Sequence, residues 1–363
     1  MRLWITRIEL TDFRNYASFV LEPDQRLTVL VGPNAVGKTN VMEAIELVTE
    51  ADSFRKPGWS DLIRDGRERA VVTLHAEGQD GRHTDVSLVV ENNRRAYRVN
   101  GSPRRTVADV AGTVPAVVFT PDDLRMVKDS ADKRRVAIDS LGTQISKAYG
   151  TVKAEYDRIV RQRNALLKER ETRAFELDPW TERLIDVGAA LTAHRIRLFE
   201  RLAPHVADVY AALSAGEELG IDYVPSWGGE QANGAAEEIA AAMERSLAER
   251  EPEERARRTT LVGPHRDDIR FTAGGREARA FASQGQQRTI ALAWKLAEIQ
   301  AVEDITQTTP VLLLDDVMSE LDESRRHALA SFVGGRAQTF VTTTNLGYFD
   351  PGLIENATVV MLT

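Results

Sequence analysis

A glycine-rich run in this sequence has the residue types and the spacing of a phosphate-binding loop: Gly32-Pro33-Asn34-Ala35-Val36-Gly37-Lys38-Thr39. Its glycines let backbone N–H groups turn toward phosphate oxygens, and a helix that begins here points its positive end at the same charge. We expect Lys38 to reach the β- and γ-phosphates and Thr39 to offer its hydroxyl to Mg²⁺. The run, extended by Asn40, therefore predicts a site for a nucleoside triphosphate and Mg²⁺.

The elements on either side of the loop are those that this chemistry requires. An apolar strand is predicted at 27–31, directly before the loop. After the loop, apolar residues recur at helical spacing, at Val41, Ala44, Ile45 and Val48. The alternative is a glycine-rich turn that happens to precede a helix, and the apolar strand disfavours it. A phosphate loop indicates only that a nucleotide is held, so other segments must define the function.

A pair of acids follows a second apolar run, 311–314. A buried parallel strand that ends in carboxylates is typical of the edge where open α/β sheets bind ligands. We expect Asp315 to hold Mg²⁺, and Asp316 to orient or deprotonate an attacking water. An acidic helix cap is the alternative for such a pair. Together with the loop, the acids complete a predicted catalytic set of Lys38, Asp315 and Asp316.

A second candidate anion site precedes the helix that starts near residue 290. A serine at a helix N-cap with a glycine beside it leaves backbone N–H groups available to an anion. One nucleotide needs one cradle, so this segment is expected to serve either another ligand or the nucleotide of a second subunit, which gives a nucleotide-sandwiched dimer. An ordinary capped helix is disfavoured because it has no need of Gly-Gln-Gln. The predicted contacts are Ser283, Gly285, Gln286 and Gln287.

Two further groups of residues have less specific patterns. A turn at 11–16 places Arg14 and Asn15 near the expected nucleotide edge, where they are predicted to contact base or phosphate; a solvated turn with buried aromatics is the alternative. A hairpin carries arginines that could follow a DNA backbone, or could protect an exposed sheet edge by charge. The predicted DNA contacts are Arg94, Arg95, Arg104 and Arg105.

The pattern of the remaining chain predicts an α/β fold with a mixed sheet and an inserted helical lobe. Alternation predicts strands at 2–10, 18–21, 69–77, 84–91 and 95–100, and an apolar run predicts another at 115–120. Helical spacing predicts a pair of antiparallel helices at 137–173 and 184–213, with a break at 176–179, and a short strand at 221–224. The predicted domains are 1–130 and 261–363, the two halves of an ATPase lobe, and 131–260, the inserted lobe.

Composition excludes several other classes of protein. The 363 residues include no cysteine, so disulfides, thiolate catalysis and cysteine-ligated metal sites are excluded. No apolar run approaches the ~20 residues that cross a bilayer, and the N-terminus alternates like a strand, so we expect a cytoplasmic protein without a membrane partner. The net charge of −8 argues against a uniformly basic nucleic-acid binder but does not report local distribution.

Taken together, the motifs resemble those of the ABC-type ATPase head of the SMC and RecF group, and at finer grain the RecF family. The resemblance covers nearly the whole chain. It rests on TDFRNY at 11–16, GPNAVGKTN at 32–40, SFR at 53–55, FTPDDLRMVK at 119–128, RR at 134–135, GPHRDD at 263–268, SQGQQRT at 283–289 and LLLDDVMSELD at 312–322. His265 and Arg266 match the family, but the sequence suggests no physical role for them.

The resemblance implies a function. It implies ATP and Mg²⁺ as cofactors, an ABC signature at 283–288, a Walker B aspartate at Asp315, and a D-loop at 319–322 in the interface of an ATP-dependent homodimer. It also implies a slow DNA-dependent ATPase that binds single-stranded, duplex and gapped DNA. The implied setting is recombinational repair, replication-fork maintenance and the SOS response, in which the protein assists RecA loading with RecO and RecR.

The chain departs from the wider ABC pattern in three places. Asp316 stands where a glutamate is usual, Thr344 stands at the switch-histidine position, and 119–123 offers no clear Q-loop glutamine. These departures predict slow hydrolysis, in which ATP acts as a timed clamp. The alternative function, the nucleotide-binding subunit of an ABC transporter, would normally have LSGGQ and a switch histidine. A small-molecule kinase would have no use for the signature.

Overall fold

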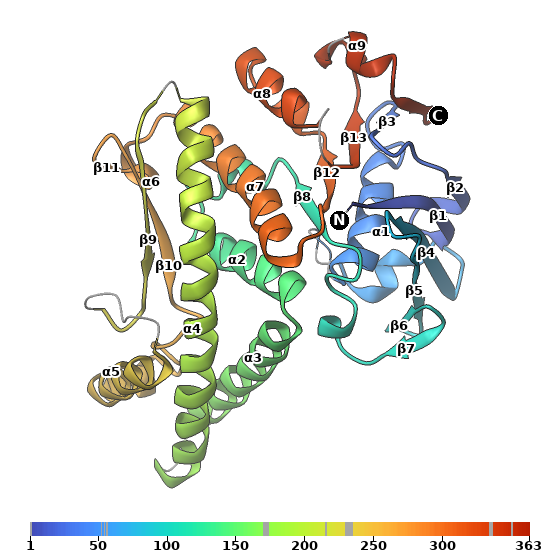
Figure 1. The fold of residues 1–363 in the computed structure, drawn as a ribbon. Helices are drawn as coiled ribbons and strands as arrows, with labels where there is room; N and C mark the ends of the chain where they lie inside the picture. Colours follow the sequence, from blue (N-terminus) through green and yellow to red (C-terminus); the bar gives the residue numbers. More distant parts are fainter. Residues whose placement is uncertain are drawn as a thin grey trace. The chain divides into compact units, whose positions relative to one another are not determined.

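The computed structural model describes residues 2–51, 53, 55, 57–169, 174–214, 216–228, 235–333, 337–349 and 351–363, without the side chains of 174–176 and 331–333. The chain forms two compact units, one of Met1–Arg125 with Ala291–Thr363 and one of Met126–Ile290 (Figure 1). The second unit thus extends beyond the predicted lobe of 131–260 and includes the 283–288 segment. The division into an ATPase lobe and an inserted lobe stays a prediction.

The first unit contains a five-stranded parallel sheet in the order β14-β3-β13-β12-β8. Every residue of the strands β3, β8, β12 and β13 is buried, which explains the nearly continuous apolar sequences of β3, β8 and β12. The bounds are Leu27–Val31 for β3, Ala116–Phe119 for β8, Val311–Asp315 for β12, Thr339–Thr343 for β13 and Thr358–Met361 for β14.

The same unit contains a six-stranded antiparallel sheet in the order β2-β1-β4-β5-β6-β7. Its tight turns at Asn92-Asn93 and Asn100-Gly101 have positive φ at every residue, as two-residue hairpins require. The bounds are Leu3–Phe13 for β1, Tyr16–Leu21 for β2, Arg69–Gly78 for β4, His83–Glu91 for β5, Arg94–Val99 for β6 and Ser102–Arg104 for β7. The predicted meander is present, and the short strand β7 extends it.

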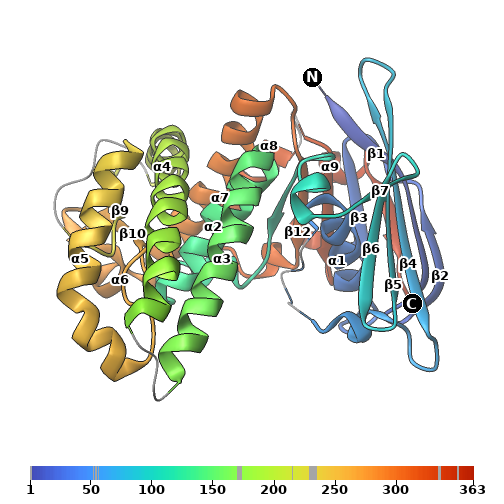
Figure 2. The same cartoon turned by 90° about the horizontal axis from the view of Figure 1, so that it is seen from below.

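Helix α1 (Lys38–Thr49) packs between the two sheets and contributes to a core that both share (Figure 2). Its apolar side chains meet residues of the parallel sheet, such as Leu313 and Phe340, and of the antiparallel sheet, such as Ile8 and Leu74. The α/β class predicted from the sequence is confirmed. The parallel and antiparallel strands, which were expected in one mixed sheet, form two.

The second unit is mainly helical. A three-stranded antiparallel sheet, β11-β10-β9, completes it. The bounds are Ala131–Ile145 for α2, Lys147–Lys168 for α3, Ala174–Leu213 for α4, Leu219–Val224 for β9, Ala236–Arg257 for α5, Asp268–Ala273 for β10, Arg276–Glu277 for β11 and Ala278–Phe281 for α6. Helix α7 (Gln284–Thr306) begins in this unit and ends in the first, which also contains α8 (Glu323–Val333) and α9 (Pro351–Ile354).

Two helix predictions for this unit are wrong in detail. The helix predicted at 137–173 is interrupted at Ser146, whose backbone is extended (φ −147°, ψ 112°) and whose side chain caps α3 by accepting a hydrogen bond from the N–H of Tyr149. The break predicted at 176–179 lies inside α4, which includes Pro179. The prediction of an antiparallel helix pair corresponds to α3 and α4, which pack together.

Within the described ranges, no helix combines the length with the apolar character that crossing a bilayer requires.

Candidate nucleotide-binding site

The phosphate loop has the shape that its glycines predict. A Cβ on Gly37 would lie 2.6 Å from Nδ2 of Asn15 and 2.7 Å from the hydroxyl of Tyr16, and Gly37 has a φ of +114°. At Gly32 a Cβ would lie 2.5 Å from the carbonyl oxygen of Leu362. Ala35 also has a positive φ, 65°. Glycine is therefore required at positions 32 and 37, where the backbone passes close to neighbouring groups.

A Gly37→Ala variant should lose both stability and nucleotide affinity, because the methyl group would displace Asn15 or Tyr16. We expect the free energy of unfolding to fall by about 1–3 kcal/mol. Gly66→Ala is the matched control, since Gly66 also has a positive φ (+75°) but no atom within 4 Å of the added carbon. Denaturant unfolding and titration with a fluorescent ATP analogue would measure the two effects; equal behaviour of both variants would contradict this account of the loop.

Lys38 lies at the start of α1 with its side chain buried against the loop. Its ammonium donates hydrogen bonds to the carbonyl oxygens of Gly32 (2.7 Å) and Pro33 (2.8 Å). The next residue, Thr39, donates from its hydroxyl to Oδ1 of Asp315 at 3.1 Å. The structure thus brings the loop and the first acid of β12 together, as their sequence patterns predict.

Thr342 ties the two acids of the site together. It lies on β13 beside Asp315 in the register of the parallel sheet. Its hydroxyl donates to Oδ1 of Asp315 (2.7 Å) and accepts from the backbone N–H of Asp316 (2.8 Å). Sequence reasoning missed this residue and singled out Thr344, which is exposed beyond the end of β13. The available signal was the threonine run at the end of a second apolar strand.

The residues at Asp315 suit Mg²⁺, a hard cation that prefers oxygen ligands. The carboxylate of Asp315 and the hydroxyl of Thr39 are adjacent and present oxygens of this kind. Burial raises the pKa of Asp315, and the hydroxyl groups of Thr342 and Thr39 oppose that shift. A cation bound here would further favour the carboxylate form, so the site fits the metal predicted for it.

Asp316 has a strained backbone and a carboxylate oxygen without a partner. Its φ is +53°, in the left-handed region, and its carbonyl accepts a hydrogen bond from Ser319. Its Oδ1 is buried and accepts no hydrogen bond from the residues that the structure describes. Burial raises the pKa of Asp316, while the positive charge of Lys38 lowers it. Strain and an unpartnered buried acceptor are both typical of functional carboxylates.

Glu43, on the buried face of α1, is a residue that sequence reasoning missed. It is fully buried, and Arg14 donates to both of its carboxylate oxygens, at 2.9 and 2.8 Å. Ser53 donates to it at 2.7 Å, and Arg55 approaches at 3.4 Å. Arg14 also donates to the carbonyl of Asp61. These contacts give Arg14 a structural role, and its nucleotide contact stays a prediction.

Asn15 contacts the phosphate loop directly. Its amide donates to the carbonyl of Val36 (3.0 Å), and its Oδ1 accepts from the amide of Asn40 (2.8 Å). Arg55 in turn donates to Oδ1 of Asn40 at 2.7 Å. The turn predicted at 11–16 is shorter than expected, because β1 and β2 leave only Arg14 and Asn15 between them. This tight hairpin holds Asn15 against the phosphate loop. The SFR motif is described only in part, since Phe54 lies outside the described residues.

The signature segment, in the second unit, forms a reciprocal cap at the start of α7. The backbone N–H of Ser283 donates to Oε1 of Gln286 (2.9 Å), and the N–H of Gln286 donates to Oγ of Ser283 (3.2 Å). Gln287 donates to the carbonyl of Ala282 at 3.0 Å. The capped helix, which the sequence pattern disfavoured, is therefore present. It is compatible with an anion site, because the Ser283 oxygen accepts in the cap and keeps its hydroxyl proton to donate.

Known proteins resemble this chain over nearly its whole length. A family model described as the RecF/RecN/SMC N terminal domain matches residues 4–361. "DNA replication and repair protein RecF" of Rippkaea orientalis is 36% identical, covering 99% of this chain and 97% of the relative. The protein of the same name from Symbiobacterium thermophilum is 38% identical, covering 95% and 92%. This chain belongs to the RecF family.

Solved structures agree with this assignment. "Structure of the recombination mediator protein RecF-ATPrS in RecFOR pathway" matches with a TM-score of 0.89 and 30% identity, covering 96% of this chain and 94% of that one. An Smc head domain from Pyrococcus furiosus, bound to the C-terminal domain of ScpA, matches with a TM-score of 0.55 and 18% identity, which shows the fold alone. The chain is therefore an ABC-type ATPase of the RecF family, and the predicted resemblance is confirmed.

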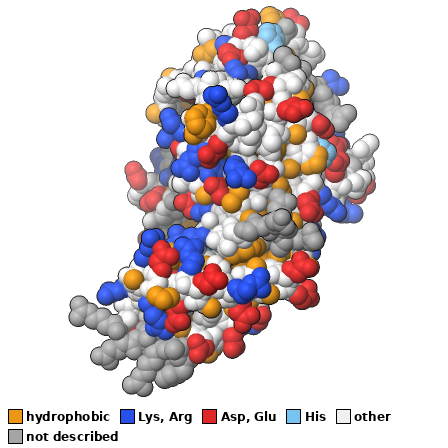
Figure 3. All heavy atoms as spheres, turned by 90° about the vertical axis from the view of Figure 1, so that its left-hand side faces the viewer, with side chains coloured by type: hydrophobic (Ala, Val, Ile, Leu, Met, Phe, Trp, Pro, Cys, Tyr) orange, Lys and Arg blue, Asp and Glu red, His pale blue; other side chains and the backbone are white. Residues whose placement is uncertain are grey.

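The four arginines predicted to bind DNA in this RecF-family chain do not share one face of their sheet. Alternation along β6 places Arg94 on one face and Arg95 on the other with Tyr97, which pairs with Arg104. Arg95 lies over the ring of Trp59, with its Cζ 4.3 Å from the ring centroid. In the second unit, the surface seen in Figure 3 has basic and acidic side chains interspersed. The DNA contacts stay a prediction.

The GPHRDD motif of this RecF-family chain forms a hydrogen-bonded polar cluster in the second unit, in which Asp267 is buried, His265 is partly buried and Arg266 is exposed. Its His265 accepts from the hydroxyl of Tyr156 at Nδ1 (2.7 Å) and donates from Nε2 to the carbonyl of Thr260 (3.1 Å). Burial lowers the pKa of His265 to about 4, so its imidazole is neutral at physiological pH. Arg266 also donates to the carbonyl of Thr260. Both residues, which had no role from the sequence, therefore have structural ones.

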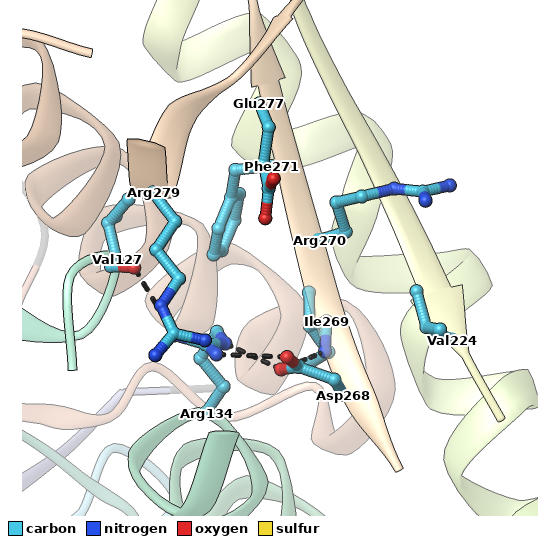
Figure 4. Close-up of a pocket in the computed structure, with 9 residues that line it drawn as sticks. All are labelled: Val127, Arg134, Val224, Asp268, Ile269, Arg270, Phe271, Glu277 and Arg279. Atoms are coloured by element: carbon cyan, nitrogen blue, oxygen red, sulfur yellow. Dashed lines mark hydrogen bonds and ion pairs between the residues drawn. The ribbon is translucent and has the colours of Figure 1, made fainter. Parts of the chain in front are cut away.

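The two aspartates of the same motif anchor strand β10. Asp267 accepts from the hydroxyl of Tyr223 (2.5 Å) and the N–H of Ser226 (2.7 Å). Asp268 forms two hydrogen bonds with the guanidinium of Arg134, at 2.7 and 3.0 Å. This pair lines a pocket of about 190 Å³ beside β10, into which Phe271 also points (Figure 4). The motif thus fixes the strand that leads toward the signature.

Proposed function

We propose that this RecF-family protein is an ATP-switched DNA clamp of recombinational repair and replication-fork maintenance. The observation that carries the proposal is the contact of Thr39 with Asp315 beside the strained Asp316. This contact brings a phosphate loop together with two acids in different environments. Asp315 accepts hydrogen bonds from Thr39 and Thr342 and suits Mg²⁺, while Asp316 has a strained backbone and is available to act on water, and an ATPase needs both roles. The relatives named for DNA replication and repair, and a structure named "Structure of the recombination mediator protein RecF-ATP in RecFOR pathway", support ATP and this setting.

Hydrolysis in this proposal is slow. The loop holds the triphosphate, Lys38 neutralises charge on its β- and γ-oxygens, and Thr39 and Asp315 hold Mg²⁺. Mg²⁺ would supply further charge stabilisation at the transferred phosphoryl group. Asp316 orients the attacking water and accepts its proton through Oδ1. An aspartate is shorter than the usual glutamate, and Thr344 provides no imidazole, so turnover is slow and ATP acts as a timer.

Clamp closure comes from a second copy of the chain. In the proposed dimer, the signature residues Ser283, Gly285, Gln286 and Gln287 contact the nucleotide held by the partner, and the D-loop at 319–322 lies at the interface. Closure of the dimer would create a groove whose arginines hold DNA phosphates at gaps and at junctions of single and double strands. The proposed partners are RecO and RecR, with RecA as the protein that is loaded. The transporter alternative has no support from the family match.

A Ser283→Arg variant tests the dimer. The arginine should fill the proposed phosphate contact in trans and abolish ATP-induced dimerisation, while ATP binding by single copies stays within about twofold of wild type. Ser18→Arg adds the same side chain at an exposed position of β2 and should dimerise normally. Light scattering with Mg·ATP and a gapped duplex measures the outcome. A Ser283→Arg protein that dimerises as well as wild type would rule out the sandwich.

A further inference from the structure

Glu217 connects the end of the long helix α4 to the signature segment within the second unit. Its Oε2 accepts a hydrogen bond from the hydroxyl of Tyr210 at 2.7 Å. Its Oε1 accepts from Nε2 of Gln286 at 2.9 Å. Tyr210 is fully buried in the last turn of α4. A single carboxylate therefore bridges a fixed point in the helical core and a side chain of the signature.

The surroundings of Glu217 hold it in this position. Ser214 donates to its backbone carbonyl at 3.3 Å. Strand β9 begins just after Glu217, and its first residue, Leu219, pairs with Ala273 at the end of β10. The turn that follows β10 contains Gly274, where a Cβ would lie 3.5 Å from Oε1 of Glu217. The carboxylate of Glu217, which is partly buried, thus has contacts with α4, the β10–β11 turn and α7, and these contacts set its direction.

The bond from Gln286 to Glu217 fixes the orientation of the Gln286 amide. Because Nε2 points at the carboxylate, Oε1 is turned toward the backbone N–H of Ser283 and accepts from it at 2.9 Å. The reversed amide would place an NH₂ group against the Ser283 N–H, which is donor against donor. Glu217 therefore selects the one amide orientation that allows the reciprocal cap.

The cap in turn sets the direction of the Ser283 hydroxyl. Its oxygen accepts from the N–H of Gln286 at 3.2 Å, so one lone pair is directed into the helix and the O–H is left to donate outward. Donation is what contact with a phosphate oxygen requires. The contacts Tyr210–Glu217–Gln286–Ser283 thus form a continuous chain from α4 to the hydroxyl proposed to touch nucleotide.

We propose that Glu217 is a positioning residue of the signature, which orients Gln286 and, through it, Ser283 for contact with the γ-phosphate bound by a second copy of this chain. This inference rests on the proposed ATP-sandwiched dimer. Glu217 itself touches no nucleotide in this account. Its role is to keep the second anion site pre-organised, so that dimer closure does not spend free energy on ordering these side chains.

A Glu217→Ala variant should leave ATP binding by single copies unchanged, because the phosphate loop lies in the other unit. It should raise the dissociation constant of the Mg·ATP-induced dimer by about tenfold, or about 1.4 kcal/mol. Glu217→Gln keeps an oxygen for Gln286 and an amide to donate to the Tyr210 oxygen, so it should restore dimer affinity to within about threefold. Tyr210→Phe, which removes one hydroxyl, should give an intermediate effect.

Glu218→Ala is the matched control, since it removes the same charge from the adjacent, exposed residue. Dimerisation is measured by analytical ultracentrifugation with Mg·ATP, and melting temperatures report whether each variant folds. If Glu217→Ala fails to fold, Glu217→Gln and Tyr210→Phe still decide the matter. Wild-type affinity in Glu217→Ala and Tyr210→Phe, or a Gln variant as weak as Ala, would overturn the inference and leave the proposed dimer standing. A wild-type protein that never dimerises with ATP would overturn both.

Discussion

Replacing Lys38 by alanine should weaken ATP binding by about 100-fold or more, because charge-assisted hydrogen bonds to two phosphates are lost together. The ammonium already lies against the loop, bonded to the carbonyl oxygens of Gly32 and Pro33. A bound triphosphate would offer it charged oxygens in place of neutral ones. The effect should therefore appear in nucleotide affinity, not only in turnover. Isothermal titration with ATP and Mg²⁺ measures it.

Lys168→Ala is a suitable control for this variant. Lys168 is exposed at the end of α3, so its removal changes the net charge equally without touching the loop. Thermal melting should separate loss of binding from loss of fold, since Lys38 also bridges two loop carbonyls. Unchanged nucleotide affinity in a folded Lys38→Ala protein would show that the triphosphate binds elsewhere.

Replacing Asp316 by asparagine should lower the rate of ATP hydrolysis by about 100-fold or more, the usual contribution of a general base. Asparagine retains the shape of the side chain but cannot accept the proton of the attacking water. The backbone bonds of Asp316 to Thr342 and Ser319 should survive, so the site stays assembled. ATP binding should be retained, and the ATP-bound dimer should accumulate on gapped DNA because release in the proposed clamp depends on hydrolysis.

The pH profile adds a second measurement to this variant. Burial raises the pKa of Asp316, and the base must be deprotonated to work. As the pH is lowered, the wild-type rate should therefore start to fall at a higher pH than an ordinary carboxylate would give, and the residual activity of the asparagine variant should lack that decline. Single-turnover hydrolysis across pH, with Asp304→Asn on α7 as a charge-matched control, would test both points. An undiminished rate would place the base at another residue.

The parts of the site that could be predicted from sequence are those written in short local runs. The phosphate loop, its strand and its helix occupy consecutive residues, and Asp315 ends an unbroken apolar strand. Thr342 and Glu43 could not be predicted in the same way. The contacts of Thr342 depend on which strands are neighbours in the sheet, and those of Glu43 depend on how the β1–β2 hairpin packs against α1. Neither feature can be inferred from the local spacing of residues in the sequence.

The helix boundaries failed for a related reason. Continuous polar and apolar spacing predicts one helix at 137–173, but the break at Ser146 depends on tertiary packing. The ring of Tyr149 lies 2.6 Å from where a Cβ of Gly142 would stand, so the close turn between α2 and α3 exists only because Gly142 has no side chain. Helix α5 is absent from the predicted elements. Its buried apolar residues are few, Ile239, Met243 and Leu247, among many charged residues, so the helical spacing is weak in the sequence.

The hydroxyl of Thr342 couples the positions of Asp315 and Asp316. One oxygen atom is bonded both to the carboxylate that suits a divalent ion and to the backbone of the neighbouring aspartate. A shift of Asp315 on loading or losing an ion would pull on that oxygen and so re-aim the water-activating group. The occupancy of the ion site would then itself determine whether Asp316 is oriented for hydrolysis, without any signal from a distant part of the molecule.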